Sequence, residues 1–147
     1  MMRSAFVTMV VAGLMSGPAL ADQDGAALFE AHCAACHSSG GVGTPGFAPA
    51  LDRPEFWQDL GEDAAPYLTG VMVKGFAAPI TVRGERFMGM VMPGVNGASA
   101  EELAQIGNWV LADLGQVEQS ITPEEVTAAR DSDLTHADLK DMRPKTE

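Results

Sequence analysis

Apolar residues recur at helical spacing in two stretches of the first half of the chain. Asp24 can cap a helix that carries Leu28 and Phe29 on one face. A second helix is expected over residues 64–74, where apolar side chains have the same spacing. Gly75 can take the left-handed position that often ends such a helix. The pattern therefore predicts two amphipathic helices separated by a long connection.

The clearest helix signal lies later in the chain. Ser99 and Glu102 have the spacing of a capping box, in which each side chain bonds the backbone N–H of the other residue. An apolar stripe follows and ends at Gly115. Its members are Leu103, Ile106, Val110 and Leu114. We expect this helix to be the last one of the main domain.

A short hairpin is expected between these helices. Residues 79–87 alternate β-branched and polar side chains around Gly84, which favours two strands joined by a tight turn. The hairpin would lead directly into the segment Phe87-Met88-Gly89-Met90-Val91-Met92-Pro93-Gly94.

Residues 116–147 form an acidic, Thr-rich extension. Thr122 and Glu125 make a second capping box, with proline at the first helical position, which predicts a short helix to about Arg130. A weaker helix is expected before Pro144, from Leu134, Leu139 and Met142. We expect the extension to be a solvated tail packed loosely on the domain, with a docking element for a partner subunit as the alternative.

The N-terminus has the features of a secretory signal peptide. Arg3 precedes an apolar stretch over residues 5–14, and the small residues Ala19 and Ala21 precede the predicted cut after Ala21. The stretch is shorter than the ~20 residues of a membrane-spanning helix, although an uncleaved anchor is the alternative. We therefore divide the chain into a signal peptide (1–21), a domain (22–115) and the extension (116–147), and expect the mature protein in the periplasm.

Composition narrows the function further. The chain has 147 residues, of which 46% are hydrophobic, as expected for one small globular domain. Its 20 Asp and Glu residues outweigh 9 Lys and Arg, for a net charge of −11, and removal of the signal peptide would take away one positive charge and no acid. With no basic stretch to follow a phosphate backbone, we expect no nucleic-acid partner.

The two cysteines of the chain, Cys33 and Cys36, lie one helical turn apart and are followed directly by His37. A disulfide between them would close only a tiny loop and constrain the unfolded chain little. A thioredoxin-like dithiol would need alternating strands and helices, which the pattern lacks. A zinc site would need two further ligands, for which only His32 and His136 remain.

Covalent attachment of one haem c is the chemistry that this pattern favours. Two thiols one helical turn apart can form thioethers to two neighbouring vinyl groups, and the next side chain, His37, then becomes the proximal iron ligand. The iron would have a sixth position, for which Met88, Met90 and Met92 are the candidates. More distant candidates are Met72, Met142, His32 and His136.

The sequence resembles the class I c-type cytochromes over about residues 24–115. The matched positions are Gly25 and Phe29, the Cys33-Ala34-Ala35-Cys36-His37 motif, Pro49 and Leu51, the Met92-Pro93 pair, and Trp109. The resemblance implies an all-α fold in which N- and C-terminal helices cross over a covalently bound haem. It also implies a short hairpin before the methionine loop and a helical C-terminal extension.

The resemblance assigns roles to individual residues. Met92 becomes the distal iron ligand, opposite His37. The carbonyl of Pro49 accepts a hydrogen bond from the other ring nitrogen of His37, which would fix the orientation of the imidazole. The first and last helices cross at Gly25, with Phe29 against Trp109.

An iron ligated by His37 and Met92 has no open position for substrate, and no rival catalytic constellation stands out. We therefore expect a single-electron carrier rather than an enzyme, either free or as the electron-accepting subunit of a periplasmic dehydrogenase. Its partners would be redox proteins with a basic docking patch, such as a dehydrogenase or a terminal oxidase or reductase. The alternatives are a haem protein with a labile distal ligand, acting in catalysis or small-ligand binding, and a haem-free docking protein with a disulfide.

Overall fold

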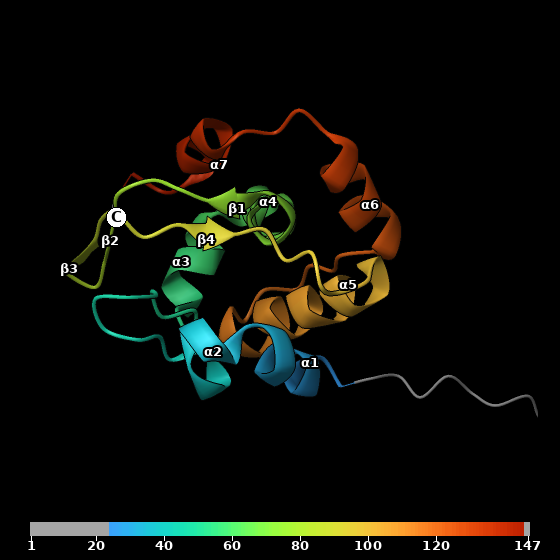
Figure 1. Cartoon of the computed structure of the whole chain (residues 1–147), viewed down its shortest axis with the longest axis horizontal. Helices are drawn as coiled ribbons and strands as arrows, with labels where there is room; N and C mark the ends of the chain where they lie inside the picture. The colour runs from blue at the N-terminus through green and yellow to red at the C-terminus, as the bar shows by residue number, and fades with distance from the viewer. Residues whose placement is uncertain (1–23, 146–147) are drawn as a thin grey trace, which may run out of the picture.

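The computed structural model describes residues 24–145, which form helices and a few short strands (Figure 1). The helices are α1 (Gly25–His32), α2 (Ala34–His37), α3 (Pro54–Asp59), α4 (Ala64–Lys74), α5 (Ala100–Trp109), α6 (Pro123–Asp131) and α7 (His136–Met142). The strands are β1 (Gly75–Phe76), β2 (Ile80–Val82), β3 (Glu85–Phe87) and β4 (Met92–Pro93). Short 3₁₀ turns cover Ser39–Gly41 and Gly61–Asp63. The predicted all-α architecture, with crossing terminal helices and a hairpin, is confirmed.

The first and last helices of the domain cross at Gly25. A Cβ atom on this residue would collide with the backbone oxygen of Gln105 and lie 2.8 Å from the Cβ of Trp109. Beside the crossing, the rings of Phe29 and Trp109 have centroids 4.9 Å apart. The expected close approach of α1 and α5 is therefore confirmed, and it is possible because residue 25 has no side chain.

Helix α5 begins as the sequence predicts. The Ser99 hydroxyl accepts from the Glu102 N–H and the Glu102 carboxylate accepts from the Ser99 N–H, so the capping box is complete. The helix does not end at Trp109 but widens into a π-helical turn over Val110–Leu114, closed by a 2.8 Å bond from the Gly115 N–H to the Val110 carbonyl. The predicted stripe thus runs to Gly115.

Helix α4 is followed by a reversal of the chain. Gly75 has the expected positive φ of 79°, but its ψ of −173° sends the chain into strand β1 rather than into a left-handed turn. Strand β1 pairs antiparallel with β4, which places Phe76 opposite Met92. The expected hairpin is confirmed as β2 and β3, joined by a turn in which Arg83 and Gly84 both have positive φ.

The C-terminal extension contains both predicted helices, but the expectation of a loosely packed tail is wrong. Val126 of α6 and Leu139 of α7 are 0% exposed, and both belong to the main core. The Asn108 side chain of α5 bonds both the N–H (2.6 Å) and the carbonyl (3.1 Å) of Ile121, which fixes the start of the extension. The acidic composition of the extension gave no indication of this packing. A few apolar side chains are enough to attach the extension to the core when each of them is fully buried.

The structure bears only in part on the predicted signal peptide and on the alternative of a membrane anchor. The predicted signal peptide and its cut after Ala21 fall outside the described residues. Within residues 24–145, no helix has the length and apolar character needed to cross a membrane.

Candidate functional site

A single apolar cavity brings together the residues that the sequence marks for chemistry. It has an empty volume of about 1110 Å³, including its open mouth. Cys33, Cys36, His37, Pro49 and Met92 all lie in its wall. The rest of the wall is mostly apolar and aromatic, as in sites that bind large planar cofactors.

The two thiols and the imidazole lie at and just after the break between α1 and α2. Cys33 leaves the helical conformation at the end of α1, and α2 restarts at once, with the His37 N–H bonded to the Cys33 carbonyl over 3.0 Å. The Cys33 side chain is partly buried and that of Cys36 is exposed, and neither thiol is in a disulfide. Burial, with a smaller contribution from the nearby Cys36, raises the pKa of the Cys33 thiol to about 11.

His37 is held in one tautomer. Its Nδ1 lies 2.9 Å from the Pro49 carbonyl oxygen, which can only accept, so Nδ1 carries the proton. Burial lowers the pKa of His37, and the bond to Pro49 opposes this shift in part. The imidazole is therefore favoured in its neutral form, with the lone pair of Nε2 free to bind a metal.

The loop after α2 is braced so that the Pro49 carbonyl stays in place. The Ser38 hydroxyl donates to the Gly43 carbonyl over 2.9 Å, and the Leu51 N–H donates to the Gly41 carbonyl over 2.7 Å. Trp57 of α3, which is 1% exposed, donates from its indole N–H to the Leu51 carbonyl. These bonds tie the loop back to its own start and to α3.

The candidate methionine ligands separate in the structure. Met92 and Met90 line the cavity, Met92 as the first residue of β4 and Met90 at the mouth, where it is 40% exposed. Met88 is 57% exposed and is not among the described residues in the wall. Of the more distant candidates, Met72 lines the cavity, whereas His32, His136 and Met142 are not among the described lining residues. The ring of His136 contacts the Lys74 carbonyl instead, over 3.1 Å.

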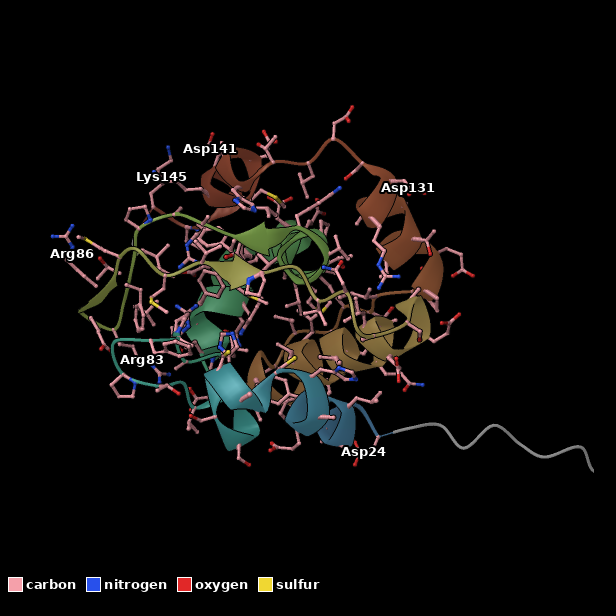
Figure 2. The ribbon with its side chains drawn as sticks, viewed as in Figure 1. Asp24, Arg83, Arg86, Asp131, Asp141 and Lys145 are labelled. Carbon is pink, nitrogen blue, oxygen red and sulfur yellow. The ribbon has the colours of Figure 1, made fainter. Side chains whose placement is uncertain are left out.

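The hairpin, which contributes Ile80 and Phe87 to the cavity wall, is bonded to the loop after α2. The Glu85 carboxylate accepts from the Gly46 N–H over 2.6 Å, and Arg83 contacts the Asp52 carboxylate over 3.3 Å. Figure 2 shows Arg83 on the side of the hairpin that faces this loop, whereas Arg86 points away from the molecule. The loop that holds Pro49 and the hairpin that leads to Met92 are thus joined directly.

The sequence analysis missed two arginines in the cavity wall. Arg53 is 2% exposed, donates from Nε to the Ala50 carbonyl over 2.8 Å, and has its guanidinium carbon 4.1 Å from the centre of the Phe56 ring. Arg143 is 9% exposed and donates to the Tyr67 hydroxyl over 2.7 Å. Each precedes a proline in a polar segment, and nothing in the local pattern indicates that its side chain is buried.

These residues fit a haem. Two free thiols can form thioethers, a neutral imidazole with a free Nε2 and a thioether sulfur can ligate iron, and the remaining wall is mostly apolar and aromatic. Because the thiols and the imidazole come from α1 and α2 while Met92 comes from β4, the possible ligands belong to separate walls of one cavity (Figure 1).

Known proteins agree with this arrangement. The sequence model of the cytochrome c family matches residues 23–112. A cytochrome c-552 from one strain of Thermus thermophilus is 32% identical over 137 residues, which cover 90% of this chain and 91% of the relative. A second Thermus thermophilus cytochrome c-552 is 31% identical over 127 residues, or 83% of this chain and 95% of the relative. With a cavity built around a Cys-x-x-Cys-His motif and these matches, the chain belongs to the cytochrome c family and is a haem-based electron carrier.

Proposed function

We propose that the protein is a periplasmic single-electron carrier that uses one covalently attached haem c. Cys33 and Cys36 would attach the haem, and His37 and Met92 would ligate its iron. The observation that carries this proposal is that a neutral imidazole, two free thiols and the Met92 side chain line one cavity.

When bound, haem c supplies a one-electron iron couple. The chain's own residues determine how that couple is used. The Pro49 carbonyl accepts a hydrogen bond from the Nδ1–H of His37, which keeps Nε2 directed for ligation and makes the imidazole a stronger ligand. Met92, as the sixth ligand, would leave no open coordination position, so substrate chemistry at the iron is disfavoured and electron transfer is favoured.

The mouth of the cavity supplies a contact surface for redox partners. Phe47, Met90 and Val91 line the cavity and are also 44%, 40% and 60% exposed. A small apolar patch beside a buried redox centre suits brief contacts, which bury less than about 1,200 Å² in total. The net charge of −11 supports partners with a basic docking patch, among them a periplasmic dehydrogenase or a terminal oxidase or reductase.

The periplasmic location rests on the N-terminal sequence. A basic residue, a short apolar stretch and small residues before the cut after Ala21 are the features of a cleaved export signal. The test is the N-terminal sequence of the mature protein from a periplasmic extract, which should begin at Asp22. A protein that stays at the membrane with residues 1–21 attached would contradict the proposal.

The haem and its ligands are tested by spectroscopy. The precursor would be produced in a periplasm with haem-attachment machinery, and its absorption recorded in both oxidation states. We expect a low-spin c-type spectrum with the weak near-infrared band of methionine–iron coordination, lost in Met92→Ala and kept in Met90→Ala. A colourless protein with a Cys33–Cys36 disulfide would overturn the proposal, and a high-spin spectrum would indicate ligand binding or catalysis.

A free carrier and an enzyme subunit share the same haem site, so a separate experiment distinguishes them. The native protein would be purified from a periplasmic extract under mild conditions and its size compared with that of the single chain. A free carrier elutes alone, whereas a dehydrogenase subunit elutes with a larger protein.

A further inference from the structure

A surface groove between the hairpin and the end of the C-terminal extension carries positive charge, although the chain as a whole is acidic. Four of the nine Lys and Arg residues of the chain line this groove, and Asp141 is the only acidic residue among its described lining residues. Three of the four are exposed, namely Arg86, Lys140 and Lys145. We call the surface around these three cations the basic groove.

The exposed cations of the basic groove are not neutralised by neighbouring acids. Within residues 24–145, no carboxylate forms an ion pair with Arg86, Lys140 or Lys145. Arg83, on the other side of the hairpin turn, contacts both Asp52 and Glu55 instead. The charge of the groove is therefore available to a group from outside the chain.

Other basic residues are used within the fold. Lys74 donates from Nζ to the Arg130 and Ser132 carbonyls over 2.8 and 2.7 Å, and Arg130 donates to the Ala98 carbonyl over 2.7 Å. These bonds tie helices together and leave little reason for a ligand to bind at either side chain. The three exposed cations of the basic groove differ from them, because no bond within the described chain explains their position.

Both walls of the basic groove are held in place by the fold. Leu139 of α7 is fully buried, and a Cβ on Gly70 of α4 would lie 2.6 Å from its Cδ2, so α7 packs closely on α4. On the other wall, the Glu85 carboxylate accepts from the Gly46 N–H over 2.6 Å and holds the hairpin. A groove whose walls are already fixed loses less conformational entropy when it binds a partner.

The basic groove adjoins the cavity that fits the haem. Ile80 of β2 lines both, so an occupant of the groove would lie against a residue that also faces the cavity. Figure 2 shows Arg86 and Lys145 on one side of the molecule and Asp24 and Asp131 on the opposite side. At physiological salt the Debye length is about 8 Å, so distant acids are screened and the nearby cations dominate in the groove.

We propose that the basic groove docks an acidic segment of a redox partner; this inference rests on the proposed electron-carrier function. Carboxylates of that segment pair with Arg86, Lys140 and Lys145, and the partner then lies beside the cavity at Ile80. A carrier meets both an electron donor and an electron acceptor. A partner with an acidic docking segment therefore complements the basic one that the net charge favours.

The binding test uses the reduced, haem-loaded protein with an isotope label for NMR, and an oligoglutamate peptide as the probe. At low ionic strength, we expect the peptide to shift the backbone signals of residues 80–86 and 139–145. The triple variant Arg86→Gln, Lys140→Gln and Lys145→Gln should bind the peptide about tenfold more weakly, because three exposed ion pairs are lost.

A matched control separates local charge from net charge. Lys140→Gln and Ala128→Glu each make the protein more negative by one charge. Ala128 is exposed on α6, which lies on the opposite side of the molecule from the hairpin (Figure 1). We expect Lys140→Gln to weaken peptide binding about twofold and Ala128→Glu to leave it close to that of the wild type. An equal effect of the two variants would contradict a local site.

Electron exchange with small complexes gives a second measurement. The triple variant should exchange electrons several-fold more slowly than the wild type with the anionic complex hexacyanoferrate, but no more slowly with the cationic complex hexaammineruthenium. The near-infrared band is recorded for each variant, because its retention shows that the axial ligands are undisturbed. Equal rates with hexacyanoferrate in the two proteins would contradict docking beside the cavity.

Three further outcomes are decisive. Peptide binding that is equal in the wild type and the triple variant overturns the inference, as do shifts confined to other parts of the chain. Inorganic phosphate that binds as tightly as the peptide at equal ionic strength also overturns it, because the groove would then be a site for a small free anion. A wild-type protein without haem would instead overturn the proposed function.

Discussion

His37 and Pro49 are twelve positions apart in the sequence, and the imidazole Nδ1 of the first donates to the carbonyl oxygen of the second over 2.9 Å. This bond determines which ring nitrogen can bind a metal. The histidine is carried by α2 and the carbonyl by a loop that is braced against α3, so the orientation of the imidazole depends on the packing of two separate elements.

Pro49→Ala should loosen this bond without abolishing it. The carbonyl remains, but the backbone around it gains freedom, so the ring N–H is exposed to solvent more often. We expect the Nδ1 proton of His37 to exchange several-fold faster in NMR spectra of the haem protein, with the low-spin spectrum retained. Pro45→Ala changes an exposed proline of the same loop and should leave the exchange rate unaltered. Equal exchange in both variants would contradict the expected role of Pro49.

Gly25→Ala should destabilise the protein through the crossing of α1 and α5. The added Cβ collides with the Gln105 carbonyl oxygen, so the two helices have to separate, at a cost of about 1–3 kcal/mol. Denaturant unfolding of the haem protein measures this change. Gly97→Ala is the control, because its Cβ meets no atom within 4 Å, and it should change the free energy of unfolding by less than about 0.5 kcal/mol.

Leu139→Ala tests whether the extension belongs to the core. Leu139 is 0% exposed, so truncating its side chain should lower the free energy of unfolding by about 2–5 kcal/mol. Val42→Ala shortens a side chain that is 58% exposed and should have almost no effect. Denaturant unfolding of each haem protein measures the change in the free energy of unfolding. If the extension were only loosely attached, both variants would show the same small change.

Asn108→Ala should weaken the attachment of the extension at its start. The variant leaves both the N–H and the carbonyl of Ile121 without their side-chain partner, which costs about 1–3 kcal/mol where these groups stay away from water. Asn108→Asp keeps the acceptor for the N–H and loses the donor, so its stability should be intermediate. Amide hydrogen exchange that is faster in the variant than in the wild type in α6 and α7, but unchanged in α1, would locate the effect in the extension.

The net negative charge predicts how the rate of association with redox partners depends on ionic strength. With a net charge of −11, association with a redox protein that has a basic patch should slow as ionic strength rises. Stopped-flow electron exchange over a salt series measures this dependence, with an uncharged small reductant as the control. A rate that is flat or increases with salt for the physiological partner would show that its docking patch is not basic.

Features that depend on neighbouring residues could be predicted from the sequence. Cys33, Cys36 and His37 lie within five consecutive positions, so the sequence could indicate haem attachment from a local motif. The capping boxes at Ser99 and Thr122 and the turn at Gly84 are equally local, and the structure has all three. Capping and turn formation involve residues a few positions apart, which is why these predictions succeed.

Features that depend on contacts between distant parts of the chain became visible in the folded protein. The pairing of β1 with β4 puts Met92 into the cavity wall and leaves Met88 outside it, although both belong to one short segment. The role of Met92 as an iron ligand remains a prediction. Likewise, the burial of Leu139 and Arg143 depends on where α7 meets α4, far away in the sequence. The composition of the extension does not reveal whether it packs against the domain. Burial depends on the surface that each side chain faces, and that surface exists only in the folded chain.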